Sequence, residues 1–131
     1  MGGHGALVLG LREPGRFASV SALAPIVAAS QVPWGTKALA AYLGPDQAAW
    51  RRHDATALIE AGHRHPGTLR IDQGEADRFL AEQLRPELFV AACAAGGQAL
   101  ELRRWPGYDH GYFFVATVIG EHLLHHARAL A

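Results

Sequence analysis

The feature that most constrains the fold of this chain is a regular alternation of short apolar stretches with longer helix-like segments. Strands are expected at three places, where branched or alternating apolar residues lie between breaks: residues 17–27, 68–72 and 99–105. Helices are expected from about residue 5 to the Pro14–Gly15 stop and over residues 115–131. A further helix is expected over residues 79–97, with Pro86 as a break or first helical position and Gly96–Gly97 as the stop. The alternation predicts an α/β fold with parallel strands and crossover helices.

A long excursion separates the first two expected strands. Residues 28–67 contain repeated proline and glycine breaks, and two stretches within them, residues 36–43 and 45–61, have helical composition. Neither a repeat nor a low-complexity segment divides the chain. We therefore expect residues 1–131 to form one partial domain with a helical excursion at about 28–67.

Composition excludes several classes of partner. The chain has 131 residues, with 12 basic and 12 acidic side chains, so its formal net charge is zero and favours neither nucleic acid nor an anionic membrane. Its apolar runs, such as residues 113–119, are too short to span a bilayer, and no secretory signal pattern is visible. The single cysteine, Cys93, excludes an internal disulfide and fits a reducing compartment. We expect a cytoplasmic protein.

Polar groups follow two of the expected strands. Asp72, Glu75 and Asp77 lie after the second strand, and Asp109 and His110 after the third. In parallel sheets the carboxyl ends of the strands collect catalytic groups at one edge. A carboxylate beside a histidine fixes its tautomer and stabilises the imidazolium, so Asp77 and His110 are the candidate pair. A nucleophile is missing from the set.

The opening MGGHGAL places glycines at the start of a helix that no strand precedes. This stretch looks like the second half of a G-x-S-x-G nucleophile elbow whose serine would lie directly before Met1. Further segments extend the likeness: SALAPIV, QVPWGTKALAAYLG, IDQGEADRFLAEQL and PGYDHGYFFVATVIGEHLLHHA. Together, in this order and spacing, they resemble the C-terminal half of the S-formylglutathione hydrolase (esterase D) family of α/β-hydrolases. We therefore expect a truncated form.

The resemblance implies a serine thioesterase that hydrolyses S-formylglutathione to formate and glutathione, as part of formaldehyde removal, without cofactor or metal. It implies that His110 is the general base, that Asp77 orients it and that Met1 lends its backbone N–H to the oxyanion hole. As the first residue of a chain, however, Met1 carries an amine. Trp34 would border the substrate mouth, although core or lid packing explains it equally well. The family usually has serine where this chain has Gly111.

Other functions stay open at this point. A general carboxylesterase would share the same residues, and a non-catalytic standalone module would need none of them. The upstream nucleotide sequence separates truncation from a standalone product, and a comparison of thioester with ester turnover separates the two enzymes. A homo-oligomer is compatible with the full-length form.

Several residues have structural interpretations. Asp77 could cap the following helix, and Asp72 and Asp109 are expected to be structural, Asp72 by bonding loop amides and Asp109 by bracing its loop. Cys93 is expected to be a buried, inert thiol. A further set shares helical spacing near a helix C-terminus and could reach one zinc ion, but a solvated helix end is favoured because no fourth ligand is evident: His122, His125 and His126.

Overall fold

The computed structural model describes residues 1–131 and contains a three-stranded parallel sheet in the order β1–β2–β3. Its strands are β1 (Ser21–Leu23), β2 (Leu69–Gly74) and β3 (Leu100–Trp105). The register pairs Ala22 with Ile71 and Ile71 with Leu102. The predicted parallel α/β sheet with crossover helices is confirmed.

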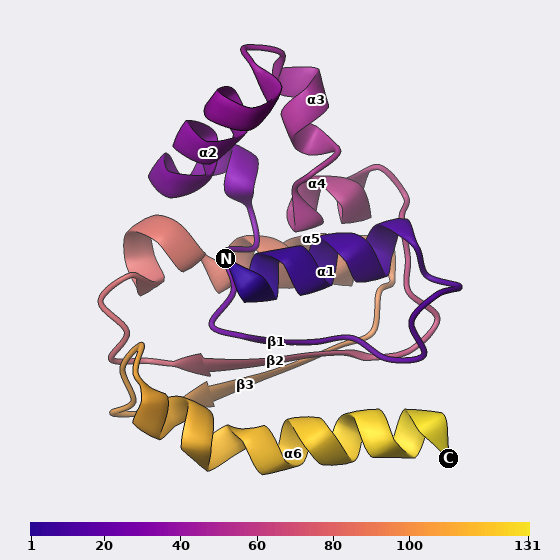
Figure 1. Cartoon of the computed structure of the whole chain (residues 1–131), viewed down its shortest axis with the longest axis vertical. Helices are drawn as coiled ribbons and strands as arrows, with labels where there is room; N and C mark the ends of the chain where they lie inside the picture. The colour runs from indigo at the N-terminus through magenta and orange to yellow at the C-terminus, as the bar shows by residue number, and fades with distance from the viewer.

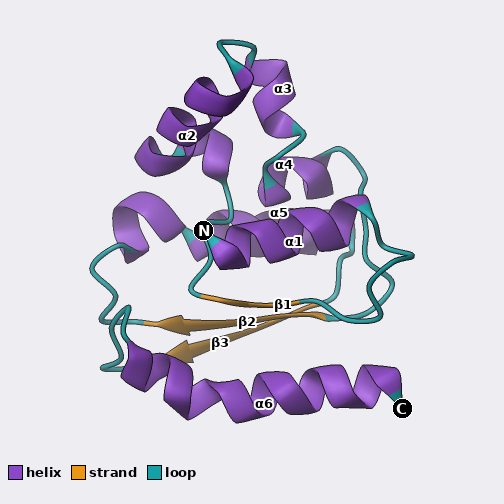
Figure 2. Cartoon of the chain, viewed as in Figure 1, coloured by secondary structure: helices purple, strands orange, loops and turns teal.

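Helices cover both faces of this sheet (Figures 1 and 2). On one face lie α1 (Gly2–Arg12), α4 (Ala55–Glu60) and α5 (Pro86–Gly96). The other face carries α6 (Tyr112–Leu130) alone. This layering places buried apolar side chains against each side of the strands, as a parallel sheet requires. No helix is both long and apolar enough to cross a membrane.

The first strand is much shorter than expected. Pairing was predicted over residues 17–27, but β1 covers only Ser21–Leu23. Just after it, the Ala24 amide still donates to the Asp72 carbonyl at 2.9 Å. Ala24 then adopts a left-handed backbone with φ 43°, and Pro25 has no N–H to continue the ladder. The apolar composition of the segment reflects burial, and only its centre is strand.

The second strand is longer than expected. Residues 68–72 were predicted and the following residues were assigned to a polar loop, but β2 runs to Gly74 with all six residues buried. The loop therefore begins at Glu75. This difference matters for the site, because Gln73 belongs to the rigid strand.

The segment from 79 to 97 divides at Pro86, as its sequence suggested. A short π-helical turn, η2 (Leu80–Leu84), ends at Arg85, which takes a left-handed conformation with φ 46°. Pro86 then begins α5. Its missing N–H costs no hydrogen bond there, because the N–H of the first helical residue has no partner within the helix. Gly97, with φ 72°, ends the helix.

The predicted helical excursion is present between β1 and β2. It contains a short 3₁₀ turn η1 (Ala29–Gln31), then α2 (Pro33–Leu43), α3 (Gln47–Arg51) and α4. Asp54 begins α4 by accepting from the Ala57 amide at 2.9 Å. Its other oxygen accepts from the amide and hydroxyl of Ser30 at 2.8 and 2.6 Å. This buried carboxylate ties η1 to α4 and fixes the excursion over the sheet.

Two groups of buried apolar residues hold the layers together. The larger one joins α1, α4 and α5 to the sheet and includes Leu7, Leu11, Ile59, Ile71 and Phe89. The smaller lies toward the carboxyl ends of the strands and includes Ile26, Val32, Leu84, Phe114 and Val118. The second group supports the loops that carry the candidate site, because Trp105, Tyr108 and Phe79 pack against it.

Candidate active site

The loops after β2 and β3 bring Asp77 and His110 into direct contact. Nδ1 of His110 lies 2.6 Å from Oδ2 of Asp77, although 33 residues separate them in sequence. The Asp77 side chain is fully buried, whereas 44% of the His110 side chain is exposed. A buried carboxylate that holds Nδ1 of a partly exposed imidazole is the arrangement of a histidine base and its orienting acid.

The Asp77 carboxylate is held by further donors. The Phe79 amide donates to Oδ1 at 2.9 Å, and the Gln73 amide nitrogen lies 3.2 Å from Oδ2. The bond from Phe79 is the kind expected of a turn or capping aspartate. The capping interpretation and the pairing with His110 are therefore compatible, because they use different oxygens.

Close contact between the two loops depends on Gly74. A Cβ atom at this position would lie 2.3 Å from the carbonyl oxygen of Tyr108. That same carbonyl accepts from the Ala76 amide at 3.0 Å, and the Glu75 amide donates to the Trp105 carbonyl at 3.0 Å. These backbone bonds join the loop that carries Asp77 to the loop that carries His110.

An apolar cavity of about 350 Å³ adjoins His110. Leu23, Ala24, Phe114 and Val115 contribute to its lining. It is large enough for a small acyl group beside the His110 side chain.

Aromatic rings continue from His110 to Trp34. The Phe79 ring meets the His110 ring edge-on at 5.4 Å between centroids and lies 4.7 Å from the Trp34 ring. Trp34 is the second residue of α2 and is 47% exposed. Trp34 therefore lies at the exposed end of a row of rings that leads to His110, and its role as a substrate contact stays a prediction.

None of the chain's three serines contacts His110. Ser19 bonds His126, Ser21 bonds both His122 and His126, and Ser30 bonds Asp54. The pair described above therefore has no serine nucleophile within residues 1–131.

Met1 and Asp109 both lie at the surface. Met1 is 66% exposed, and its carbonyl accepts from the Gly5 amide at the start of α1. Its assignment to an oxyanion hole stays a prediction. Asp109 is exposed, and its side chain makes no hydrogen bond within the chain, so the expected bracing of its loop is wrong.

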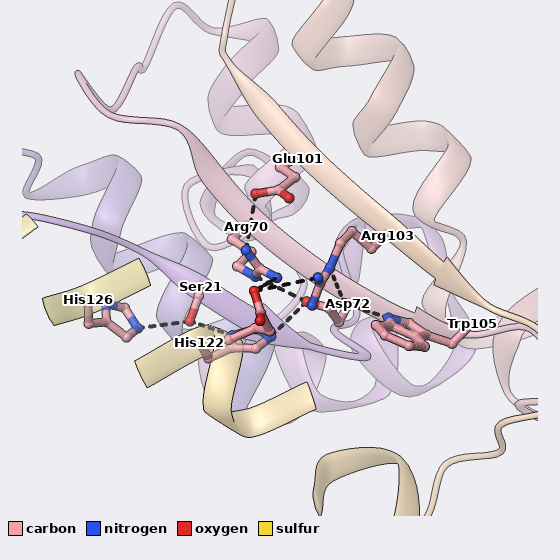
Figure 3. Close-up of polar contacts among 9 residues, drawn as sticks. Ser21, Arg70, Asp72, Glu101, Arg103, Trp105, His122 and His126 are labelled. Carbon is pink, nitrogen blue, oxygen red and sulfur yellow. Dashed lines mark hydrogen bonds and ion pairs between the residues drawn. The ribbon is translucent and has the colours of Figure 1, made fainter. Parts of the chain in front are cut away.

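A second polar cluster surrounds Asp72 (Figure 3). Its Oδ1 accepts from Arg103 Nε at 2.8 Å and from Trp105 Nε1 at 2.6 Å, and its Oδ2 lies 2.9 Å from His122 Nε2. Asp72 is structural, as expected, but it binds side chains of β3 and α6 and not loop amides. Burial alone would raise the pKa of Asp72, but the hydrogen bonds from these three side chains outweigh it and hold the pKa well below its usual range.

The histidines near the end of α6 are not a solvated helix end. His122 is buried, with its Nδ1 2.8 Å from the Ser21 hydroxyl. His126 lies between the hydroxyls of Ser19 and Ser21 at 2.7 and 2.9 Å. Nowhere in the chain do three or more potential ligands converge as a metal site requires. His122 and His126 instead attach α6 to β1 and β2, through Ser21 and Asp72.

Sequence reasoning missed the burial of His122, although a signal was present. Phe114, Val118 and His122 recur at a spacing of four, which places them on one helical face. That face is the buried one. Gln73 was missed as well, because nothing around an isolated glutamine in the sequence indicates that it contacts Asp77 in the folded chain.

Cys93 lies in the core, as expected. It is 2% exposed, and burial raises its pKa to about 12. Such a thiol is chemically quiet at neutral pH.

Comparisons with known proteins identify the family of this chain. A model of the Esterase family, described as "Putative esterase", matches residues 1–125. S-formylglutathione hydrolases of Arabidopsis thaliana and Rattus norvegicus are 49% and 47% identical to the chain over 99% of its length. The chain covers 46% of each of them, so it spans about half the length of these curated relatives.

Solved structures show the same relationship. An S-formylglutathione hydrolase from Agrobacterium tumefaciens is 50% identical and superposes with a TM-score of 0.96, covering 99% of this chain and 47% of that one. Dipeptidyl peptidase 4 of Porphyromonas gingivalis, at 17% identity, has a TM-score of 0.67 over 94% of this chain and 18% of its own, which shows the fold alone. The chain belongs to the Esterase family and has the fold of part of an α/β-hydrolase.

Proposed function

We propose that this chain is the histidine-bearing part of a serine thioesterase that hydrolyses S-formylglutathione to formate and glutathione. The observation that carries the proposal is the 2.6 Å contact between His110 and Asp77 at the carboxyl edge of the sheet. The similarity to S-formylglutathione hydrolases along 99% of the chain supports the choice of substrate.

In this proposal His110 acts first as base and then as acid. Its Nε2 takes the proton of a serine hydroxyl as the serine oxygen attacks the formyl carbon, and the imidazolium returns the proton to the leaving thiolate of glutathione. Water then attacks the formyl ester by the same route and releases formate. Asp77 keeps the proton on Nδ1 and stabilises the imidazolium.

The remaining parts come from outside the pair. The serine belongs to the part of the enzyme that residues 1–131 do not cover, and the backbone N–H of Met1, once in a peptide bond, donates to the oxyanion. Trp34 and Phe79 border the path along which the thiol side of the substrate leaves. We propose that the domain over residues 1–131 is completed only with that other part.

A general carboxylesterase is the second candidate, favoured by the description of the matching family model, which names an esterase and no thioester. The apolar cavity beside His110 would accept the acyl group of an ester as readily as that of a thioester. We also propose a cytoplasmic location, since a substrate made from reduced glutathione belongs in a reducing compartment. A homo-oligomeric form of the complete enzyme is compatible with this proposal.

The test uses a joined enzyme, in which this chain is fused to the part of the Agrobacterium tumefaciens enzyme that it does not cover. We expect the joined enzyme to release glutathione from S-formylglutathione, with kcat/KM at least tenfold above that for a simple acetate ester. The 131-residue chain assayed alone should show no turnover. Equal or better ester turnover would favour the carboxylesterase, and serine-dependent turnover by the chain alone would contradict the proposal.

A further inference from the structure

Gln73 lies directly behind the candidate pair. It is the penultimate residue of β2 and is fully buried. Its Nε2 lies 3.2 Å from Oδ2 of Asp77, the same oxygen that His110 contacts. The amide therefore reaches the carboxylate from the rigid strand, while His110 reaches it from a loop.

The orientation of the Gln73 amide follows from its neighbours. Its nitrogen lies within reach of two acceptors, Oδ2 of Asp77 and the Gly74 carbonyl at 3.0 Å. Both require a donor, so the NH₂ group must face them. Its oxygen, Oε1, is buried, and no donor of this chain reaches it.

An unpaired buried amide oxygen is unfavourable for folding. A leucine of similar size would avoid this cost, because it has no polar atom to leave unsatisfied. The glutamine supplies two hydrogen bonds that leucine cannot, one to the Gly74 carbonyl of the same strand and one to the Asp77 carboxylate of the candidate pair. The presence of glutamine here is thus better explained by the geometry of the pair than by stability.

We propose that Gln73 is a positioning residue of the hydrolase, an inference that rests on the function proposed above. The Phe79 amide holds Oδ1 and the Gln73 amide holds Oδ2, so the Asp77 carboxylate is fixed at both oxygens. With the carboxylate fixed, Oδ2 stays aimed at Nδ1 of His110. The other ring nitrogen, Nε2, is then kept in the orientation that proton transfer needs.

Gln98 provides a matched control for this role. It is also a buried glutamine, but it lies just before β3, at the opposite end of the sheet from the pair. Its oxygen accepts from the His65 amide at 2.8 Å, and its nitrogen donates to the carbonyls of Gly67 and Ala99 at 3.2 and 3.1 Å. Gln98 is therefore fully satisfied and remote from the chemistry.

The experiment compares Gln73→Leu with Gln98→Leu in the joined enzyme. We expect Gln73→Leu to lower kcat by about 10- to 100-fold, because a hydrogen bond to a charged group is lost and the pair loosens. KM should be unchanged and the melting temperature should stay within about 3 °C. Gln98→Leu should do the reverse, with a lower melting temperature and normal kcat.

A third variant, Gln73→Glu, gives a readout that a purely structural role would not move. A protonated glutamic acid can donate to Asp77, whereas its carboxylate would repel it. The kcat of Gln73→Glu relative to the unmodified joined enzyme should therefore fall as the pH rises from about 5 to about 8. A ratio that is constant with pH would overturn the inference, even if Gln73→Leu is unstable.

His110→Ala in the same enzyme separates this inference from the proposed function. Near-normal turnover by His110→Ala would mean that the proposed function itself fails. If His110→Ala is inactive while Gln73→Leu keeps kcat within twofold, only the positioning role of Gln73 is wrong. Loss of activity in both variants, with the pH-dependent ratio of Gln73→Glu, supports the inference.

Discussion

The Cα atom of Gly74 faces the carbonyl oxygen of Tyr108 so closely that a side-chain carbon at Gly74 would lie 2.3 Å from it. This approach lets the loop after β2 bond the loop after β3 through the Ala76 amide. The distance between Asp77 and His110 is therefore set by backbone contact between the loops as well as by the side chains themselves.

Replacing Gly74 with alanine should separate the two loops. We expect Gly74→Ala to lower kcat of the joined enzyme by about tenfold or more, because shifts of 1 Å between catalytic groups can cost two orders of magnitude. It should also lower the unfolding free energy by about 1–3 kcal/mol through overpacking. Steady-state kinetics and urea unfolding measure the two effects.

Gly120→Ala is the control for this substitution. Gly120 lies in the exposed middle of α6, and nothing lies within 4 Å of the position where its Cβ would be. This variant should be more stable by about 0.5–1 kcal/mol and retain normal kcat. If Gly74→Ala behaved like Gly120→Ala, the close approach would not govern the site.

The Asp72 cluster should matter for stability and not for chemistry. We expect Asp72→Asn to lower the unfolding free energy by about 3–5 kcal/mol near pH 7, because it leaves Arg103 and His122 without their buried charged partner. Turnover per folded molecule should be unchanged. Asp46→Asn, at the exposed start of α3, should change the unfolding free energy little, since asparagine also caps helices well.

The same cluster predicts a pH dependence with a definite sign. Because the folded-state pKa of Asp72 lies below its unfolded value, its ionisation stabilises the fold fully above that unfolded value and progressively less as the pH falls toward the folded one. The difference in unfolding free energy between the unmodified protein and Asp72→Asn should therefore be constant from about pH 5 to 7 and shrink below about pH 4. A difference that grew on acidification would contradict this account of the cluster.

The core position of Cys93 predicts a protected thiol. Because burial raises its pKa to about 12, very little of the thiol is ionised at pH 8. A thiol reagent should therefore label Cys93 slowly in the folded protein and at the rate of a free cysteine in denaturant. Rapid labelling without denaturant would mean that the region around α5 opens readily.

Trp34 should influence the substrate more than the chemistry. Trp34→Ala in the joined enzyme is expected to raise KM for S-formylglutathione several-fold, since an aromatic contact of this kind contributes about 0.5–1.5 kcal/mol. Its kcat should change less than threefold. Tyr42→Ala removes an exposed ring of α2 and should leave KM unchanged. Equal KM values for Trp34→Ala and Tyr42→Ala would indicate that Trp34 only packs against its neighbours and does not contact the substrate.

Much of the fold could be predicted because local patterns and global topology agree. The alternation of strand and helix signals, the stop at Gly97 and the start at Pro86 all depend on residues close in sequence. The length of β1 could not be predicted, because the residues around it are apolar for burial and its end depends on the left-handed turn at Ala24.

The candidate site could be predicted only in part. Strand order places the loops of Asp77 and His110 at one edge, so their pairing followed from topology. The roles of Gln73 and His122 could not be predicted in this way, because each depends on a contact with a distant segment. For His122, the helical face it occupies was visible, but which face met the sheet depended on the partner Asp72.

The central claim is that Asp77 and His110 act as one unit, and a double-mutant cycle in the joined enzyme tests it most directly. We expect Asp77→Ala and His110→Ala each to lower kcat by about three orders of magnitude or more. The double variant should be no slower than the slower single variant, because residues of one catalytic unit are not additive. Two reductions that multiply in the double variant, or near-normal kcat in either single one, would contradict the claim.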